Sequence, residues 1–262
     1  MNTHITNIAR NLMPDLYASL VKIKRNFILK KFAKNYPETK IFHTEPKENK
    51  KLYSQDNQDY IVYENFFKNK KTGFFCDIGG NHPLKLNNTR YFEELGWHGI
   101  AFEPLPHMTK LWSELRKAKL FPFALSDNEG EVIFTVVKDE TGWEDMLSFV
   151  KETGEVESRF QTYEIKVQTK IFKNIIMEEN ITHIDYLSLD VEGHELNVLK
   201  GIDFKKIKID VLTIENNPPS CVLYGDEKIR TLMFDNNYLL WGRTVGLDDI
   251  YVSKDFLVSI NE

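Results

Sequence analysis

The stretch Phe74–Pro83, FFCDIGGNHP, is followed after a short helix-like interval by Gly99–Pro104, GIAFEP. In each stretch an apolar strand runs into an acid, Asp77 shortly before two glycines and Glu103 directly before a proline. Doubly wound α/β folds hold the adenosine half of a cofactor at strand ends of this kind. The two stretches therefore predict an open parallel sheet that binds a nucleotide-type cofactor.

Strands and helices alternate beyond residue 51, with no internal repeat. Expected strands cover residues 73–78, 98–103, 120–124, 131–137, 184–191 and 209–215, and expected helices residues 58–67, 89–95, 111–119 and 195–199. Residues 238–243 and 249–252 are expected to form a final antiparallel pair. This order predicts an α/β fold: an open, mostly parallel sheet with helices on both faces and a terminal antiparallel hairpin.

The segment from Met146 to Gln168 fits the alternation least well, because charged and aromatic residues interrupt it. Irregular segments inside compact domains are often functional loops. An insertion over the ligand crevice and a plain surface excursion both remain open.

Composition limits the class of protein. With 262 residues and 42% hydrophobic content, the chain can form one large or two small domains with a substantial core. Cys76 and Cys221 form no CxxC pair, and Cys76 lies in an apolar strand, so we expect a buried free thiol and a reducing, cytoplasmic compartment. No signal-like segment and no run of about 18 apolar residues is found, so we expect a soluble protein or one held at a membrane surface.

The net charge of −5 is unevenly distributed, because residues 1–51 carry eleven Lys and Arg against four Asp and Glu. Apolar residues recur there at intervals of three and four, as on an amphipathic helix: Leu12, Leu16, Leu20, Ile23 and Phe27. A helix that caps the core and a helix that lies on anionic lipid or an acidic partner both remain open. Residues 40–51 read as a linker, so we expect a basic helical extension over 1–50 and the main domain over 51–262.

Five acids stand at expected strand ends: Asp77, Glu103, Asp127, Asp190 and Glu215. The carboxyl ends of parallel strands meet at one edge of a sheet, so these side chains should face one region. Gly79 and Gly80 allow the backbone to approach a ligand closely, and Glu103 can accept hydrogen bonds from both ribose hydroxyls.

The glycine turn distinguishes between cofactors. A dinucleotide usually requires G-x-G-x-x-G, so that its pyrophosphate can reach a helix N-terminus. Here the turn reads GGNHP over residues 79–83, with no third glycine and an acid at its start. S-adenosylmethionine has no phosphate and carries cationic ammonium and sulfonium groups, so an acid-rich crevice favours this methyl donor over NAD.

Four motifs occur in a fixed order: Asp77-Ile78-Gly79-Gly80-Asn81, Phe102-Glu103-Pro104, Ala124-Leu125-Ser126-Asp127, and Leu189-Asp190-Val191-Glu192-Gly193-His194-Glu195 with Val198-Leu199-Lys200-Gly201. Together they resemble the FkbM family of S-adenosylmethionine-dependent methyltransferases, over about residues 52–255. The resemblance implies a class I, Rossmann-like methyltransferase fold, with a seven-stranded sheet whose last strand is antiparallel. It also implies O-methylation of a hydroxyl on a sugar or small metabolite.

The same resemblance assigns site residues by motif. It places Asp77 and Gly79 around the methionine part of the donor, and Glu103 at the ribose. It places Ser126 and Asp127 at the adenine. The other positions assigned to the cofactor are Gln55, Gly80, Asn81, Pro104 and Asp190.

Proton removal from the acceptor needs a base, because a neutral hydroxyl is a poor nucleophile and the donor already has a good leaving group. His194 follows Asp190 by four residues where a strand turns into a helix, and imidazole titrates near cellular pH. Glu192 is the alternative base. A His194 that only caps the helix or bonds a neighbouring acid is equally open. The catalytic candidates are therefore His194, Asp190 and Glu192.

Asp190, Glu215 and Asn216 form a second constellation of oxygen ligands at two strand ends. Hard oxygen ligands suit Mg²⁺ or another divalent cation, which could bind the acceptor oxygen beside the donor methyl. This set is similar to that of metal-dependent catechol and macrolide-sugar O-methyltransferases. An Asp190 that only orients the donor's amino group, with Asn216 in a turn, remains the alternative.

The leading hypothesis is an S-adenosylmethionine-dependent O-methyltransferase that acts on a sugar or glycan hydroxyl, with a capsular or other surface polysaccharide as one such acceptor. The acidic core argues against nucleic acid as substrate. Two alternatives stay open: an NAD-dependent oxidoreductase on a similar sheet, and a non-catalytic protein that its basic N-terminal segment attaches to a membrane or partner.

Overall fold

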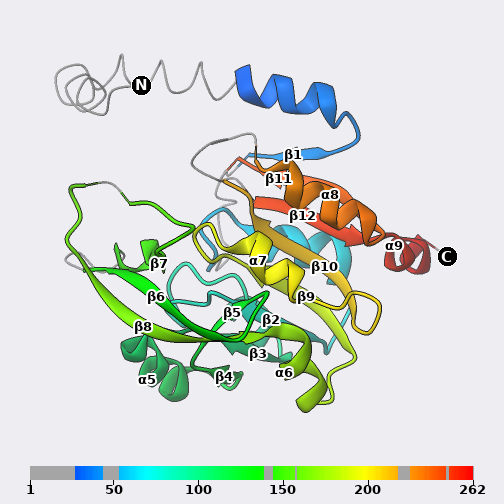
Figure 1. The fold of residues 1–262 in the computed structure, drawn as a ribbon. Helices are drawn as coiled ribbons and strands as arrows, with labels where there is room; N and C mark the ends of the chain where they lie inside the picture. The colour runs from blue at the N-terminus through cyan, green and yellow to red at the C-terminus, as the bar shows by residue number, and fades with distance from the viewer. Residues whose placement is uncertain are drawn as a thin grey trace.

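Figure 1 shows a computed structural model that describes residues 27–43, 53–138, 144–156, 158–217, 225–245 and 248–261. The main sheet of this described part has eight strands. In spatial order they are β1 (Lys40–Phe42), β11 (Tyr238–Thr244), β12 (Asp248–Ser253), β10 (Lys208–Glu215), β9 (His183–Leu189), β2 (Phe74–Ile78), β3 (His98–Phe102) and β4 (Lys119–Phe121). Neighbours pair in parallel except around β12, which is antiparallel to both β10 and β11.

The expected terminal hairpin is therefore confirmed as β11 and β12, but the expected number of seven strands is wrong for the described sheet. The additional strand is β1, which pairs in parallel with Gly242–Thr244 of β11. Its residues fall within the stretch that we predicted to be a linker. A helix over residues 27–35 precedes β1, and Phe32 on it is fully buried in the core. Residues 27–43 thus contribute to the sheet and core of the domain that was expected to begin at residue 51.

The central strands β2, β9 and β10 are short apolar runs that are almost entirely buried, as expected for parallel strands covered on both faces. Ile78 of β2 pairs with Leu189 of β9, and Leu189 pairs with Ile214 of β10. The three strands therefore end at the same edge of the sheet. The acids that follow them in the sequence are brought to that edge.

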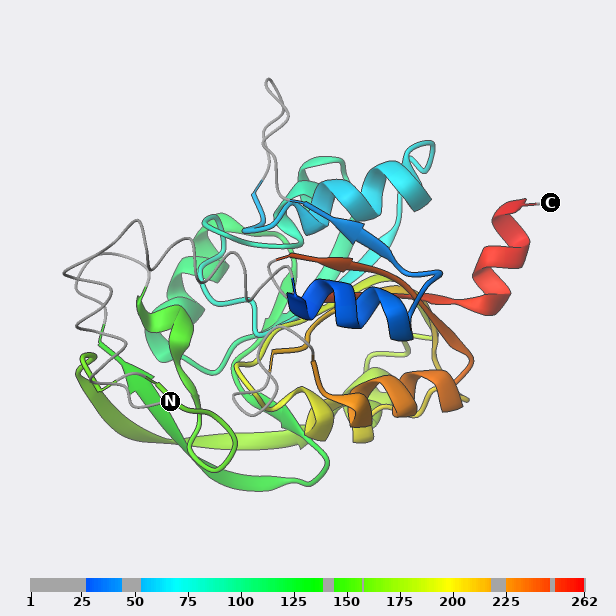
Figure 2. The same cartoon turned by 90° about the horizontal axis from the view of Figure 1, so that it is seen from above.

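Helices cover both faces of the sheet: α3 (Gln58–Val62), the π-helical turn η1 (Tyr63–Phe67), α4 (Arg90–Glu94), α5 (Pro106–Leu115), α6 (Phe172–Glu178), α7 (Glu195–Lys200), α8 (Glu227–Asp235) and α9 (Lys254–Asn261). Figure 2 shows α7 and α8 on one face and α3 with η1 on the other. Val198, Met233 and Phe32 pack in one apolar cluster with the sheet. Val62, Phe92 and residues of the opposite face form a second cluster.

A second, four-stranded sheet lies beside the first in the described residues, in the order β5 (Ala124–Ser126), β8 (Thr162–Ile171), β6 (Gly130–Val137) and β7 (Phe149–Val150). The strand expected at 120–124 is split, because β4 belongs to the first sheet and β5 to the second. The helix expected at 111–119 begins earlier, at Pro106, since proline fits the first turn of a helix. Trp112 of α5 packs with Phe134 and Val167 of the second sheet.

The segment from Met146 to Gln168 is part of this second sheet rather than a surface excursion. It contains the end of the 3₁₀ turn η2 (Glu144–Leu147), all of β7 and most of β8. Residue 157 is not described. Met146 lines the cavities at the strand ends, so the interpretation of an insertion over the crevice agrees with the structure.

The amphipathic pattern in the N-terminal segment is described only at its end. Leu12, Leu16, Leu20 and Ile23 lie outside the described residues, and Phe27, the first residue of the 27–35 helix, is exposed. Among the described residues, no helix combines the length and the apolar character that crossing a membrane requires. The buried free thiol expected at Cys76 is confirmed, whereas Cys221 lies outside the described residues.

Candidate functional site

The glycine turn after β2 brings three strand ends together. Gly79 has a φ of +83°, in the left-handed region that favours glycine. Its backbone N–H donates to the carbonyl of Phe102 (3.0 Å), and the N–H of Asp190 donates to the carbonyl of Ile78 (3.0 Å). A Cβ on Gly79 would lie 1.7 Å from the carbonyl oxygen of Asp190. A larger residue at position 79 would therefore separate β2 from β9 and displace Asp190.

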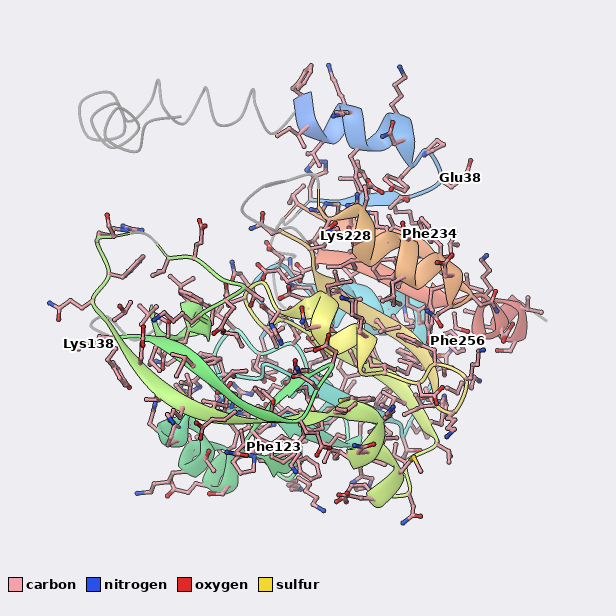
Figure 3. All side chains as sticks on the ribbon, in the orientation of Figure 1. Glu38, Phe123, Lys138, Lys228, Phe234 and Phe256 are labelled. Carbon is pink, nitrogen blue, oxygen red and sulfur yellow. The ribbon has the colours of Figure 1, made fainter. Side chains whose placement is uncertain are left out.

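Two adjoining cavities open at this edge of the sheet. The first, called here the apolar cavity, has walls that include Phe102, Phe123 (labelled in Figure 3), Leu125, Phe134 and Val150. The second, the polar cavity, has walls that include Gln55, Asp77, Asn87, Asn88 and Ser188. Residues that line both cavities are Gly79, Asn81, Met146, Asp190 and Glu192.

Glu103, expected at the ribose, lines the apolar cavity and is 3% exposed. Its Oε1 accepts a hydrogen bond from the N–H of Leu105 (2.7 Å) and its Oε2 one from the N–H of Asn81 (2.8 Å). Burial raises the pKa of this carboxyl to about 7, although the two backbone hydrogen bonds act to lower it. The carboxyl group is thus rigidly held, and each oxygen keeps a second lone pair for a ligand.

Asp77, expected near the methionine part of the donor, lines the polar cavity and is 3% exposed. Its Oδ2 accepts hydrogen bonds from the Thr89 hydroxyl (2.7 Å) and from the side-chain amide of Asn87 (3.0 Å). Burial raises the pKa of Asp77, and these hydrogen bonds and the Arg116 guanidinium only partly oppose that effect.

Asp190, Glu192 and Glu215, called here the carboxylate group, lie between the cavities and the end of β10. One oxygen from each lies within 4.8 Å of one from each of the others. Burial raises the pKa of Glu192 to about 8, with a further contribution from Glu195. Burial also raises the pKa values of Asp190 and Glu215 well above the usual carboxyl range, and their neighbours' negative charges add to the shift. These shifts favour the protonated form of the three carboxyl groups near neutral pH, and no cation of the described residues is among their causes. A cationic ligand would favour their ionised form.

Asn216, an expected metal ligand, turns away from the carboxylate group. Its side-chain amide donates to Asp249 Oδ2 (2.8 Å), and its Oδ1 accepts from the N–H of Asp226 (2.6 Å). The Asn216 amide thus joins β10 to α8 and β12, whereas the expected ligands Asp190 and Glu215 lie together with Glu192.

His194, the expected base, lines the apolar cavity and is 5% exposed. Its Nε2 lies 3.0 Å from the Ser126 hydroxyl and its Nδ1 lies 3.2 Å from the Thr153 hydroxyl. It occupies the N-cap position of α7 without a side-chain capping bond. Burial lowers the pKa of His194, against smaller opposing effects of Asp127 and Glu152. Both ring nitrogens are thus engaged by protein hydroxyls, whereas Glu192 faces both cavities.

The remaining expected cofactor residues divide into two groups. Gln55 lines the polar cavity and Pro104 the apolar cavity. Gly80 lies so close to Trp112 that a Cβ would approach the indole to 2.6 Å. By contrast, Ser126 bonds His194 and Asp127 is exposed, and neither is among the residues that line the apolar cavity. The structure therefore does not bring Asp127 together with the other four acids.

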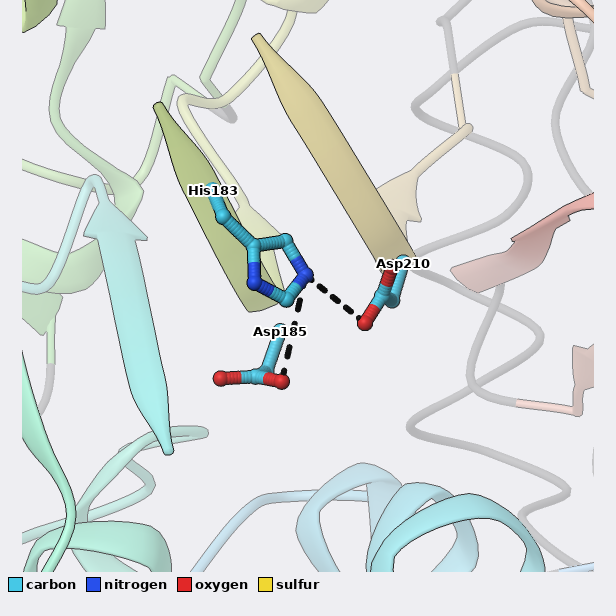
Figure 4. Close-up of side chains that lie close together, drawn as sticks. All are labelled: His183, Asp185 and Asp210. Carbon is cyan, nitrogen blue, oxygen red and sulfur yellow. Dashed lines mark hydrogen bonds and ion pairs between the residues drawn. The ribbon is translucent and has the colours of Figure 1, made fainter. Parts of the chain in front are cut away.

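A second cluster of titratable side chains lies at the opposite, amino-terminal ends of β9 and β10 (Figure 4). His183 Nε2 lies 2.9 Å from Asp210 Oδ2 and 4.0 Å from Asp185 Oδ1. Both carboxylates also have lysine partners, Lys70 for Asp185 and Lys208 for Asp210. This cluster is an ion-pair network with its charges balanced.

The sequence was compared with models of known protein families, and one model matches the region that contains the site. A family model described as "Methyltransferase FkbM domain" matches residues 77–240. The chain belongs to the FkbM methyltransferase family. No curated protein and no solved structure gave a match. In this FkbM methyltransferase, the matched region runs from Asp77 in β2 to Leu240 in β11, and it contains Glu103, His194 and the whole carboxylate group.

Some cavity residues of this FkbM methyltransferase were missed by sequence reasoning. Asn87 and Asn88 line the polar cavity, where Asn87 bonds Asp77 and Asn88 bonds Ser188 (2.9 Å). Asp145 lines the apolar cavity from η2. Polar residues of this kind show no periodicity and stand in short irregular segments, so only the fold reveals their position.

Proposed function

We propose that this FkbM methyltransferase transfers a methyl group from S-adenosylmethionine to a hydroxyl of a sugar or glycan. The observation that carries the proposal is the carboxylate group beside two adjoining cavities, which has no cationic partner among the described residues. Partly buried carboxylates without cationic partners are costly to ionise, and a positively charged ligand relieves that cost. The ammonium and sulfonium of S-adenosylmethionine are such charges.

The order of the sheet supports a class I, Rossmann-like fold. Without the edge strand β1, seven strands remain, and the last of them in the sequence, β12, is the antiparallel one. In such sheets ligands bind beyond the carboxyl ends of the parallel strands. Both cavities occupy that position.

The residues present fit the methyl donor better than NAD. Lys85 is the one cationic residue among the described residues that line the two cavities, whereas carboxylates occur in both. A pyrophosphate would be repelled by these carboxylates. The side-chain Oδ1 of Asn81, which lies between the cavities, is buried without a hydrogen-bond partner in the described part of the chain. A ligand N–H or O–H would satisfy it.

The proposed arrangement places the adenosine half in the apolar cavity beside Glu103, and the methionine half near Asp77 and Asp190. The donor supplies a methyl group on a sulfonium that is already a good leaving group. Glu192 lies at the junction of the cavities and is our proposed base, because its raised pKa of about 8 makes it an effective proton acceptor once ionised. Glu195 contributes to the raised pKa of Glu192, and His194 holds the loop before α7 through Ser126 and Thr153.

A divalent cation is a further proposal for the same carboxylate group. Three carboxylate oxygens within 4.8 Å of one another fit the oxygen preference of Mg²⁺. The three residues Asp190, Glu192 and Glu215 would hold it, and its chemistry would lower the pKa of an acceptor hydroxyl. Chelation by EDTA with restoration of activity by Mg²⁺ or Mn²⁺ supports this role, and full activity in EDTA contradicts it.

The proposed acceptor class is supported by the amide and hydroxyl side chains that line the polar cavity, which suit the hydroxyls of a carbohydrate beside the methionine half of the donor. Capsular or other surface polysaccharide is our proposed acceptor type, and nucleic acid is disfavoured by the negative charge of the site. We also propose a cytoplasmic location, with peripheral membrane contact through the basic residues of the 1–51 segment.

The deciding experiment measures methyl transfer from labelled S-adenosylmethionine to a panel of glycans, together with thermal melting. S-adenosylhomocysteine at about a hundredfold excess over its Kd should raise Tm by roughly 5–10 °C, and NADH should not. A shift with NADH and none with S-adenosylhomocysteine would favour an oxidoreductase. If S-adenosylhomocysteine binds but no methyl group is transferred to any acceptor, in wild type as in Asp190→Ala, a non-catalytic protein would be favoured.

A further inference from the structure

The apolar cavity is closed on one side by residues of the second sheet. Asp145, Met146, Ser148 and Val150, from η2 and β7, all line it. The turn is anchored to β6, because the Ser148 hydroxyl accepts a hydrogen bond from the N–H of Val137 (3.0 Å). The N–H of Ser148 also donates to the Asp145 carbonyl (3.1 Å). This segment therefore forms a fixed wall of the cavity.

Asp145 is an unusual residue for such a wall, since it is only 4% exposed and carries a carboxyl group. Its Oδ2 accepts a hydrogen bond from Nε2 of His107, the second residue of α5, at 2.9 Å. Within the described residues no hydrogen bond to its Oδ1 is found, and this oxygen is not among the fully buried unpaired polar atoms. Because Asp145 lines the cavity, a ligand there can reach Oδ1 and donate a hydrogen bond to it.

Asp145 shares its surroundings with Glu103. Both residues line the apolar cavity, and the negative charge of Asp145 is one of the smaller causes that raise the pKa of the Glu103 carboxyl. The other walls of that space are apolar and include Phe102, Phe123 and Leu125. A flat apolar ring with hydrogen-bond donors at its edges, such as an adenine nucleoside, matches this arrangement of two acids and apolar walls.

We propose that Asp145 accepts a hydrogen bond from the adenosine half of the methyl donor, and that His107 is a positioning residue that holds the carboxylate toward the cavity. This inference rests on the proposed binding of S-adenosylmethionine. It gives Asp145 the contact that the motif had assigned to Asp127, which is exposed and does not line the cavity. The inserted segment thus contributes a specificity-determining residue rather than only covering the site.

The test is calorimetric titration of the full chain with S-adenosylhomocysteine and two analogues. S-inosylhomocysteine replaces the adenine amino group with a carbonyl oxygen, and the 2′-deoxy analogue lacks a ribose hydroxyl. Asp145→Asn should bind S-adenosylhomocysteine about 10- to 100-fold more weakly than wild type, as expected for loss of a hydrogen bond to a charged group. The analogue that lacks the group contacted by Asp145 should bind wild type weakly, and Asp145→Asn should weaken its binding little further. Which analogue behaves in this way identifies the group that Asp145 contacts.

His107→Leu and His107→Gln test the positioning role, since the His107 side chain is half exposed and its replacement should leave the fold intact. The leucine variant should weaken binding while it keeps the analogue preference, and glutamine, which can still donate to Asp145, should restore part of the affinity. Glu114→Gln, at an exposed position on the same helix, is the matched control and should bind as wild type.

Two outcomes would overturn the inference, and they are distinguishable from failure of the proposed function. In the first outcome, Asp145→Asn and His107→Leu bind S-adenosylhomocysteine within about twofold of wild type, and the analogues lose as much affinity in the variants as in wild type. This outcome contradicts only the role of Asp145. Failure of the wild-type chain to bind S-adenosylhomocysteine contradicts the proposed donor and this inference together. Should Asp145→Asn not fold, the His107 pair and its analogue preferences still decide the question.

Discussion

Two groups of charged residues lie in neighbouring parts of this sheet and differ in their burial and in their partners. In the carboxylate group, burial and mutual repulsion raise the pKa values of Asp190, Glu192 and Glu215. Asp249 on β12 is fully buried, whereas the three acids of the carboxylate group are only partly buried. Arg243 and Arg230 offset the effect of burial on Asp249, and its pKa is lowered. The Asp249 carboxylate is neutralised by the protein's own arginines and stabilises the fold. The carboxylate group has no such partner among the described residues and is available to bind a cationic ligand.

The largest expected effect is on catalysis. Glu192→Gln removes the proposed base and should lower kcat by about 10²- to 10⁴-fold, because general base catalysis contributes on that scale. Steady-state kinetics with a labelled donor measure it, and donor affinity should change less. Glu114→Gln on the surface of α5 is the control. Unchanged kcat in Glu192→Gln would assign the base to another residue, with His194 next to be tested.

On the paired side of the comparison, Asp249→Asn should destabilise the fold by about 3–5 kcal/mol, because it leaves two buried guanidinium groups without their carboxylate. Denaturant unfolding of the wild type and the variant gives this difference. Asp190→Asn, at a partly buried acid with no cationic partner among the described residues, should cost far less or even stabilise. Equal losses in the two variants would mean that Asp190 also has a structural partner.

The pH dependence of stability should separate the two groups further. Burial raises the pKa of Glu103 to about 7 and that of Glu192 to about 8, so the folded chain binds more protons than the unfolded chain above the ordinary carboxyl range. Stability should therefore fall as pH rises from about 5 to about 8 and level off above that. Melting temperatures across this range measure the trend. Glu192→Gln should flatten it and raise Tm at pH 8, and a trend as steep as in wild type would contradict the assignment.

The smallest expected effect concerns Phe32, which packs over the arginine partners of Asp249. Phe32 is fully buried, and its ring lies 5.0 Å from the guanidinium carbon of Arg230 and 5.5 Å from that of Arg243. Phe32→Leu should cost about 1–2 kcal/mol through lost packing and lost cation–π contact. Unfolding midpoints provide the measurement. No loss of stability would argue against residues 27–43 as part of the domain.

Local sequence patterns predict the strands and the glycine turn that build the site. Each of these strands is an apolar run that ends at an acid, and the whole pattern fits in about ten consecutive residues. The acids at 77, 103, 190 and 215 are placed as expected for the same reason. The edge strand β1 was missed, since its partner β11 lies about 200 residues away and no local signal marks the pairing. The alternation of Ile165, Val167 and Thr169 along β8 was a signal that could have predicted the second sheet.

The roles of individual side chains were harder to predict than their neighbourhood. The sequence left open whether His194 acts as a base or only caps the helix or bonds a neighbouring acid, and the partner of its Nδ1, Thr153, comes from a segment 41 positions away in the chain. Asp145 reaches the apolar cavity only because η2 folds back against α5. Such contacts depend on tertiary packing, which a residue pattern does not encode locally.

Proton release on donor binding tests most directly whether the unbalanced carboxylates exist to bind a cationic methyl donor. Calorimetric titration with S-adenosylmethionine in buffers of different ionisation enthalpy, at about pH 7.5, should show release of a substantial fraction of a proton, because the bound cation lowers the raised pKa values. Glu192→Gln should release less. Binding without proton release, or tighter binding of NADH than of S-adenosylmethionine, would contradict the account.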